Sequence, residues 1–333
     1  MSNLRPVFEP LTVIDGYVIL KRIGKGGFGD VYLVEDPKNQ QFALKTEYLN
    51  AEKKGMDNEL KIYRQLKGCK YVPQIYASGS NDVCKYFVMD LLGPSISSCR
   101  LTQRGRRFML RNTLFLAEKT LFAIRRIHLK GIIHRDIKAS NFIIRPYAKN
   151  PLYLLDYGIS RNIIDPKTKK ILPNEGGRFV GTAKYASPNA LSKQQLSYRD
   201  DLYSWYYMIS EFANGRLPWS KVKDRDELYE IKIRIDPSKV RGELPYQFSE
   251  VYKMIQQYEY EDFPDYKEIY GLIQAARNYY NIERTGHEWK DIWEMNQEAC
   301  ELVQKDAKHK YETYGTAETE SFGEDNGNCC RIY

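Results

Sequence analysis

Two short stretches of the chain carry side chains that together could transfer a phosphoryl group. Residues 133–141 read I-H-R-D-I-K-A-S-N and place a carboxylate and an ammonium group two residues apart, at Asp136 and Lys138. Asp156 follows an apolar run further along, and it and Asn141 offer the hard oxygen ligands that Mg²⁺ prefers. Phosphoryl transfer needs these parts: a carboxylate that orients a hydroxyl, a cation at the moving group, and metal ligands beside both.

A glycine-rich stretch earlier in the chain predicts a nucleotide-binding hairpin. Gly24, Gly26 and Gly29 match G-x-G-x-x-G, with apolar residues alternating on both sides. This motif alone would also fit a dinucleotide-binding fold, but there it opens a helix, whereas here Val31 leads into a strand. The hairpin is therefore the better interpretation, and its glycines would let the backbone close over phosphates.

The whole set of motifs resembles that of the eukaryotic protein kinases. H-R-D-x-K-x-x-N and D-Y-G follow the glycine-rich loop and the F-A-L-K segment that ends at Lys45, in the order and spacing of that family. Either aspartate alone would be interpreted as a loop residue that caps a helix. The set is not explained in this way.

Further segments narrow the resemblance to the casein kinase I superfamily. They are L-L-G-P-S at 91–95, G-T-A-K-Y-A-S at 181–187 and R-D-D-L at 199–202. The segments L-P-W-S-K-V-K-D at 217–224 and P-D-Y at 264–266 look most like the tau-tubulin kinase branch. D-Y-G and the A-S dipeptide of the H-R-D stretch instead resemble the vaccinia-related kinases, so the branch stays open.

The resemblance implies an α+β, bilobal protein-kinase fold. A small N-lobe (17–90) would hold an antiparallel sheet with one main helix, a hinge (90–95) would follow, and a larger C-lobe (96–310) would be mainly helical. Residues 1–16 would form a lead-in. Residues 311–333 are rich in Thr, Glu, Gly and Asn and are expected to form a short disordered tail.

Local patterns predict individual elements within this frame. A helix is expected between 53 and 66, with Gly68 at its C-cap, and a long helix is expected to be capped by Asn112 or Thr113. Residues 201–214 are apolar on nearly every side, which predicts a buried helix. We also expect a hairpin at 75–80 and 84–89 and helices at 248–258, 264–279 and 288–308.

The kinase resemblance also implies roles for individual side chains. Asp136 would orient the substrate hydroxyl, Lys138 would stabilise charge on the group in flight, and Thr182 would hydrogen-bond to both. Lys45 would hold the α- and β-phosphates of ATP. Glu59 would pair with Lys45; the alternative for Glu59, a surface i,i+4 partner, fits less well beside an apolar stripe.

The ATP pocket that the resemblance implies is drawn from both lobes. Met89 would guard its back, Leu92 would bond to adenine through its backbone, and Ile143 would form its floor. Asn141 and Asp156 would bind Mg²⁺. The nucleotide contacts expected are Ile23, Gly24, Gly26, Phe28, Gly29, Val31, Ala43, Lys45, Met89, Leu92 and Ile143.

Supporting roles are implied for residues around these motifs. His134 is expected to be a core histidine that props the loop, and Asp201 to tie the loop's backbone to a helix. In many kinases the arginine that matches Arg135 pairs with a phosphorylated loop. The resembled superfamily is generally active without phosphorylation of that loop, so we expect constitutive activity. Lys184 replaces the superfamily's arginine at a site of phosphate recognition and lacks its bidentate fork, which would weaken a preference for phosphorylated substrates.

The composition predicts a globular protein that lies inside the cell, in the cytoplasm and also in the nucleus. The 333 residues are 42% hydrophobic and 13% aromatic. No apolar run reaches the length of a membrane span, and residues 1–15 lack a signal-peptide pattern. The six cysteines lack paired zinc spacing and fit a reducing compartment. Cys329 and Cys330 are interpreted as free thiols or, alternatively, as lipidation sites.

The formal charge of +8 is unevenly distributed. The basic groups are either solvated faces or surfaces that recruit acidic or phosphorylated substrates. No nucleic-acid-binding module is recognised. We therefore expect a monomer whose partners are protein substrates: acidic, phosphorylated or cytoskeleton-associated. The basic groups are Arg100, Arg104, Arg106, Arg107 and Arg111; Lys167, Lys169 and Lys170; and Lys221, Lys223 and Arg225.

The motifs together predict an enzyme that phosphorylates serine and threonine hydroxyls of proteins with ATP. Lys138, two residues after Asp136, favours these hydroxyls over tyrosine. A scaffold that binds nucleotide without catalysis would usually have lost a catalytic or metal-binding residue, and all of them are present. A kinase of small molecules is disfavoured by residues 181–187, which in the resembled family face a polypeptide.

Overall fold

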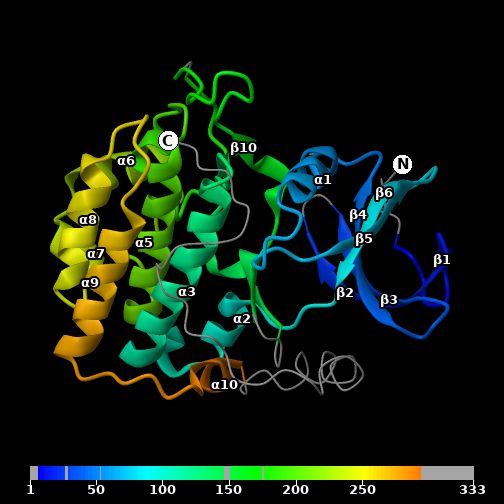
Figure 1. Cartoon of the computed structure of the whole chain (residues 1–333), viewed down its shortest axis with the longest axis horizontal. Coiled ribbons are helices and arrows are strands. Elements are labelled where there is room, and N and C mark those ends of the chain that lie inside the picture. The colour runs from blue at the N-terminus through cyan, green and yellow to red at the C-terminus, as the bar shows by residue number, and fades with distance from the viewer. Residues whose placement is uncertain (1–6, 27–28, 53, 146–150, 175, 294–333) are drawn as a thin grey trace.

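The computed structural model describes residues 7–26, 29–52, 54–145, 151–174 and 176–293. An antiparallel sheet lies at one end of the molecule and a group of helices at the other, with helix α1 between them (Figure 1). This arrangement confirms the predicted α+β class with a sheet-containing part followed by a helical part. Phe28 and the predicted tail lie outside the described residues, as do Cys329 and Cys330.

Six strands form one antiparallel sheet in the order β1-β2-β3-β4-β6-β5. Successive strand residues point to opposite faces. Tyr32 and Leu44 therefore belong to a small cluster on one face, whereas Leu33, Ala43 and Phe87 join the main core on the other. The strands are β1 Val13–Ile14, β2 Tyr17–Lys25, β3 Asp30–Glu35, β4 Gln41–Tyr48, β5 Ile75–Ser80 and β6 Cys84–Asp90. The last two confirm the predicted second hairpin.

Helix α1 (Met56–Gln65) packs on the core face of the sheet through Met56, Ile62 and Tyr63. It begins three residues later than the earliest predicted start. Its first amides are capped from the neighbouring strand, because Glu47 Oε2 accepts from the backbone N–H groups of Gly55 (2.6 Å) and Met56 (2.8 Å). The helix ends before its predicted C-cap, Gly68, which follows with φ +83°.

Two long helices form the centre of the helical part. α3 (Leu110–His128) and α5 (Tyr198–Asn214) pack together, and α5 is buried along most of its length, as its all-round apolar pattern predicted. The surrounding helices are α2 Ile96–Leu101, α4 Pro188–Leu191, α6 Arg225–Arg234, α7 Pro237–Arg241, α8 Gln247–Gln257, α9 Tyr266–Tyr279 and α10 Glu288–Trp293. Two small sheets pair β7 (Ile132–Ile133) with β10 (Arg161–Asn162) and β8 (Phe142–Ile144) with β9 (Leu152–Leu154).

The predicted start of the long helix was wrong. α3 begins at Leu110, and Asn112 and Thr113 lie buried inside it rather than at its cap. A tertiary contact fixes the entry instead, because the Phe108 N–H donates to Phe212 O at 2.9 Å. The helices α2, α4, α6 and α7 were not predicted, since each has ten residues or fewer and therefore fewer than three turns.

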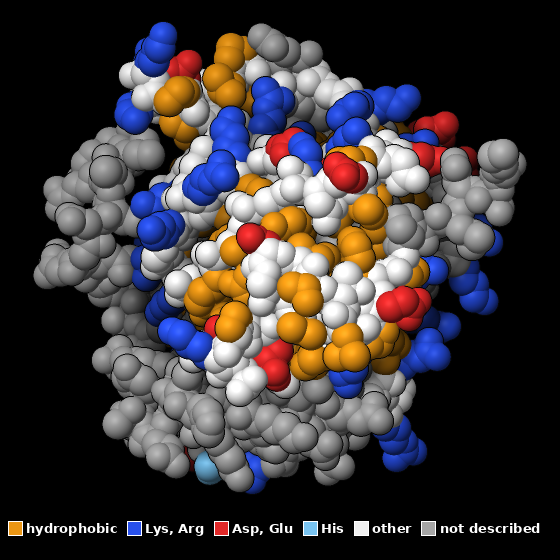
Figure 2. Space-filling model, turned by 90° about the vertical axis from the view of Figure 1, so that its right-hand side faces the viewer, with side chains coloured by type: hydrophobic (Ala, Val, Ile, Leu, Met, Phe, Trp, Pro, Cys, Tyr) orange, Lys and Arg blue, Asp and Glu red, His pale blue; other side chains and the backbone are white. Residues whose placement is uncertain are grey.

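The surface carries scattered apolar and basic side chains. On the face of the sheet-containing end, apolar side chains gather near the middle and lysines and arginines lie around the rim (Figure 2). Arg100 does not belong to the exposed basic group expected for its segment, since it is only 7% exposed. No helix in the described part of the chain combines the length and apolar character needed to cross a bilayer.

Candidate active site

The H-R-D stretch is fixed by the N-terminal end of α5. Asp201 accepts hydrogen bonds from the backbone N–H groups of His134 (2.6 Å) and Arg135 (2.8 Å), and His128 Nε2 lies 2.9 Å from the same carboxylate. These contacts confirm the predicted tie. Burial works against the charge of Asp201, but the hydrogen bonds and positive charges of His128 and His134 together outweigh it and lower the pKa of the carboxyl. Arg135 has φ +67°, a conformation that this cluster of bonds holds in place.

His134 is fully buried, as predicted, and its Nε2 lies 2.9 Å from Leu155 O. The Leu155 N–H in turn donates to Asn141 O at 2.9 Å. These two contacts place Asp156, the next residue, beside Asn141. The two proposed metal ligands therefore come together although fifteen positions separate them in the chain.

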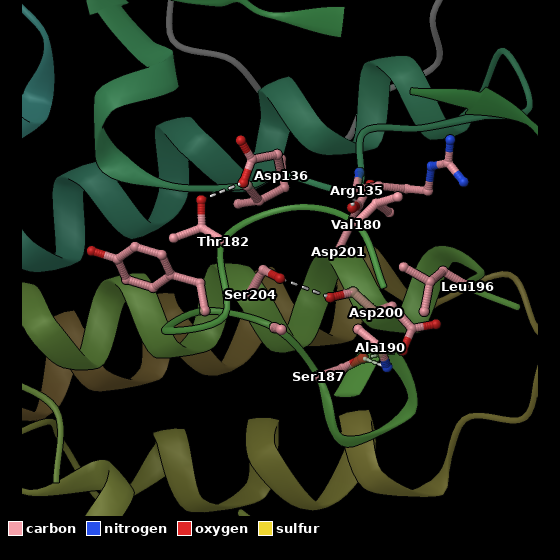
Figure 3. A pocket seen from close by; sticks show the side chains of 13 residues that line it. Arg135, Asp136, Val180, Thr182, Ser187, Ala190, Leu196, Asp200, Asp201 and Ser204 are labelled. Carbon is pink, nitrogen blue, oxygen red and sulfur yellow. Dashed lines mark hydrogen bonds between the residues drawn. The ribbon is translucent and has the colours of Figure 1, made fainter. Parts of the chain in front are cut away.

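Asp136 lies at the centre of a group of three side chains. Its Oδ2 accepts from Lys138 Nζ (2.6 Å), and its Oδ1 accepts from the Thr182 hydroxyl (2.7 Å). Thr182 also accepts from Lys138 at 3.2 Å, and Figure 3 shows its hydroxyl pointing toward Asp136. Asn141 Nδ2 donates to Asp136 O at 2.9 Å, which turns the amide oxygen of Asn141 away from this bond. The structure thus brings together the side chains expected to orient a hydroxyl and those expected to hold a metal.

Gly181 allows Thr182 to reach this group. It has φ +89°, and a Cβ at this position would lie 2.4 Å from Arg135 O. Any side chain here would therefore collide with the backbone of the H-R-D stretch.

Lys45 joins two carboxylates from different parts of the chain. Its Nζ lies 2.7 and 2.9 Å from the two carboxylate oxygens of Glu59 and 3.3 Å from Asp156 Oδ1. Burial opposes the charge of Lys45, but Glu59 and then Asp156 outweigh it and raise the pKa of the ammonium group. Burial also opposes the charge of Asp156, and Lys45 overcomes it and lowers the pKa of that carboxyl. The inward orientation predicted for Glu59 is confirmed.

The glycine-rich loop is anchored at its C-terminal end. Thr46 Oγ1 accepts from the Asp30 N–H (3.1 Å) and donates to Asp30 O (3.0 Å). A Cβ on Gly29 would lie 1.6 Å from Thr46 O, so only glycine fits. On the other side of the loop, the Gly26 N–H donates to Gly29 O at 2.9 Å. The two described ends of the loop are therefore joined to each other and, through Asp30, to β4.

The other expected nucleotide contacts lie on paired strands and on the connection between the two parts. Val31 is opposite Lys45 in the sheet and Ala43 is opposite Met89. Gly24 pairs with Val31, and Ile23 precedes it on β2. Leu92 lies in the connection between the two parts. The N–H of the next residue, Gly93, donates to Ile144 O at 2.8 Å, and Ile144 follows Ile143 on β8.

Lys184 does not present an isolated charge in the structure. Its ammonium group forms an ion pair with Glu211 of α5. Glu211 is 2% exposed, accepts from Tyr185 Oη at 2.5 Å, and lies 3.4 Å from an Arg100 nitrogen. One buried carboxylate thus holds three groups, which explains why Arg100 is buried and why Lys184 is turned toward the protein.

Lys232 supports the same segment from α6. It is 3% exposed, and its Nζ donates to three backbone carbonyls at 2.6–3.2 Å while lying over the rings of Tyr207 and Trp219. Among the described residues, no carboxylate lies within ion-pair distance of it. The three carbonyls are those of Ala183, Lys184 and Ala186.

We expect the stability that Lys232 contributes to increase with pH. Burial lowers its pKa from 10.5 to about 7. Between these values the unfolded chain holds a proton that the folded protein lacks, so the free energy of unfolding rises with pH. Below about pH 7 both states are protonated and the buried charge exerts its full cost.

Chemical denaturation of the wild type and of Lys232→Met from about pH 6 to about pH 9 tests this expectation. The stability of the wild type relative to the variant should increase over that range. Lys239→Met, at an exposed position of α7, should show no such trend. A constant or falling difference for Lys232→Met contradicts the expectation.

Several supporting residues were missed from the sequence. Lys232 follows the buried Leu228 by four residues, so helical spacing could have placed it on the buried face. Glu211 was hidden inside an apolar helix. Glu47 and Asn58 gave no signal, because the groups that they bind are backbone atoms of other elements.

Comparison with known proteins decides the family. The family model described as a protein kinase domain matches residues 17–305. This chain belongs to the protein kinase family. The kinase carries the motifs, the sheet with its helix α1, and the helical part in the order that the family requires.

Three relatives of this chain, from three different organisms, are named as kinases. A probable serine/threonine-protein kinase of Dictyostelium discoideum is 34% identical, over 82% of this chain and 56% of its own length. The serine/threonine-protein kinase spe-6 of Caenorhabditis elegans is 31% identical, over 88% of this chain and 80% of its own length. The casein kinase I homolog 3 of Saccharomyces cerevisiae is 27% identical, over 83% of this chain and 62% of its own. The kinase thus spans little more than half of the first relative, and its domain is of the serine/threonine class.

Proposed function

We propose that the kinase transfers the terminal phosphoryl group of ATP to serine and threonine hydroxyls of protein substrates. The observation that carries this proposal is the contact of Asp136 with both Lys138 and Thr182, in a loop that α5 holds in place. Asp136 would accept the hydrogen bond of the substrate hydroxyl. Lys138 would stabilise charge on the transferred group, and Lys45 would bind the α- and β-phosphates.

The residues present fit Mg²⁺, which we propose as the metal. Asp156 is ionised, because Lys45 lowers the pKa of its carboxyl, and the Asn141 amide is oriented by its bond to Asp136 O. A carboxylate and an amide oxygen are the hard ligands that this ion prefers. Bound there, the ion would neutralise charge on the ATP phosphates. ATP itself would lie beneath the glycine-rich loop, against the nucleotide contacts expected on both parts of the protein, from Ile23 to Ile143.

We also place the kinase in the casein kinase I superfamily, nearest to the tau-tubulin kinase branch. The segments at 91–95 and 181–187 support the superfamily, as does the similarity to a yeast casein kinase I homolog. The segments at 217–224 and 264–266 support the branch. The same proposal includes substrates that are associated with the cytoskeleton. It also includes a monomeric state and a location in the cytoplasm and nucleus.

We also propose that the kinase is constitutively active and prefers acidic or phosphorylated substrates. Arg135, which matches the arginine that pairs with a phosphorylated loop in many kinases, already has a partner within the protein, because its Nε donates to Ile159 O at 2.6 Å. Burial and the nearby charges of Arg161 and Arg178 lower the pKa of Arg135 to about 10. Three positive charges near one another would favour acidic peptides. Lys184 would contribute less, since Glu211 already binds it.

Transfer of radiolabel from ATP to casein tests the proposal directly. The wild type, first treated with phosphatase, should label casein, and Lys45→Ala should not. Plain acidic peptides and the same peptides carrying a phosphoserine should both be better substrates than neutral ones. A protein that binds ATP but labels neither casein nor peptides would instead be a nucleotide-binding scaffold.

A further inference from the structure

The contact between α1 and the turn that follows Asp156 is held by one amide side chain. Asn58 Nδ2 donates to the backbone carbonyls of Tyr157 (3.1 Å), Gly158 (3.2 Å) and Ser160 (2.9 Å). We propose that Asn58 is a positioning residue, which docks α1 on this turn and thereby keeps Glu59 and Asp156 together on Lys45. The inference rests on the proposed function and identifies what holds its active arrangement.

The position of Asn58 in the sequence makes this coupling direct. It immediately precedes Glu59, and the turn that it binds, η3 (Tyr157–Ile159), immediately follows Asp156. Glu59 and Asp156 are the two carboxylates that contact Lys45. One side chain therefore joins the neighbours of both, and a shift of α1 away from the turn would separate them.

The chemistry of the contact requires a side chain that donates hydrogen bonds. Three carbonyl oxygens converge on Nδ2, which shares two hydrogens among them. A carboxylate in the same place could only accept hydrogen bonds and would repel the carbonyls, and an apolar side chain would leave them without this donor. Asparagine is the side chain whose length and donor capacity match this site.

Two other contacts fix the start of α1, one against the turn and one against the sheet. A Cβ on Gly55 would lie 3.1 Å from Gly158 Cα and 3.2 Å from Gly158 O, so the two backbones meet where neither residue has a side chain. From the opposite side, Glu47 caps the first amides of α1. The start of α1 is thus fixed both to the sheet that carries Lys45 and to the turn that carries Asp156.

Such a contact would hold α1 and the turn together through an unmodified side chain. Kinases control activity by moving this helix and this turn between two arrangements. Here the amide favours one of them through neutral hydrogen bonds, which do not depend on modification. Weakening the contact of Asn58 should let α1 and the turn separate. Residues 181–187, which Glu211 and Lys232 hold, should stay in place.

The test compares Asn58→Leu and Asn58→Asp with Gln65→Leu, which removes an amide from an exposed position of the same helix. Both Asn58 variants should lower kcat by roughly 10- to 100-fold, because the displaced groups no longer meet the nucleotide correctly. KM for a peptide substrate and the thermal midpoint should stay close to those of the wild type. Gln65→Leu should leave all three unchanged.

A second variant tests the same contact without touching the amide. Gly55→Ala places a methyl group against Gly158 and should lower kcat in the same way, by a smaller factor. Hydrogen exchange provides a readout that does not need activity. The amides of the η3 turn should exchange faster in Asn58→Leu than in the wild type or Gln65→Leu.

The possible outcomes separate this inference from the proposed function. If the wild type phosphorylates casein but kcat of Asn58→Leu stays within about twofold of it, Asn58 does not position the site. If kcat falls while the peptide KM rises by the same factor and the thermal midpoint drops strongly, the substitution has damaged the whole protein. That result would also overturn the positioning role of Asn58. If the wild type is inactive, the proposed function fails, and unchanged exchange in Asn58→Leu would then refute the docking role itself.

Discussion

Asp136→Asn is expected to lower the rate of phosphoryl transfer by about 10²- to 10⁴-fold while nucleotide binding stays nearly unchanged. The substitution keeps the volume of the side chain, but the amide cannot accept the substrate proton, and its NH₂ group faces donors. Lys138 and Thr182 both donate to Asp136 in the present structure. Lys45 and the described glycines of the glycine-rich loop lie on other elements of the chain. Initial rates with labelled ATP and casein, together with calorimetric binding of ATP, measure the two effects.

Asp82→Asn, at an exposed position between β5 and β6, is a matched control for this substitution. It removes the same charge and should alter neither quantity. Equal losses of transfer and nucleotide affinity in Asp136→Asn would argue against the role assigned to Asp136. They would indicate that the loop had rearranged or that the nucleotide binds against it.

Asp201→Ala is expected to abolish activity and to lower the free energy of unfolding by roughly 3 kcal/mol or more. Asp201 is buried, and the His134 N–H, the Arg135 N–H and His128 would lose the same acceptor, at about 1–3 kcal/mol for each unsatisfied buried group. Arg135 would also be released from its left-handed conformation. Urea denaturation and initial rates measure the two losses.

Asp201→Asn separates the contributions to this effect. It retains one oxygen acceptor, so it should be less destabilised than Asp201→Ala and should keep part of the activity. A variant Asp201→Ala with wild-type stability would show that water or another side chain replaces the carboxylate. In that case α5 would not be what fixes the H-R-D stretch.

The residues assigned to catalysis could be proposed from the sequence because they lie in contiguous motifs. Asp136, Lys138 and Asn141 fall within six residues, and together with the other motifs they indicate the chemistry. The buried pattern of α5 was also readable, since it is apolar on every side. The start of α3 was not, because a backbone bond from Phe108, rather than a polar cap, determines it.

Some of the residues that hold the site in place, unlike Asp201 and His134, could not be predicted from the sequence. Asn58 binds carbonyls about 100 positions away, and Lys232 binds carbonyls 46 to 49 positions away. Any residue type can present a backbone carbonyl, so the partner leaves no mark in the sequence. Glu211 likewise is recognisable only once α5 is seen next to Lys184 and Arg100.

The attachment of the H-R-D stretch to α5 has a consequence for how the protein loses function on heating. Asp201 belongs to a helix that is buried along most of its length, so the acceptor for His134 and Arg135 should stay in place until that helix opens. The helical part of the protein, which contributes Asp136, should therefore stay folded until global melting. The sheet-containing part contributes Lys45 and Glu59 from a sheet and one short helix. It can loosen in a separate, earlier event.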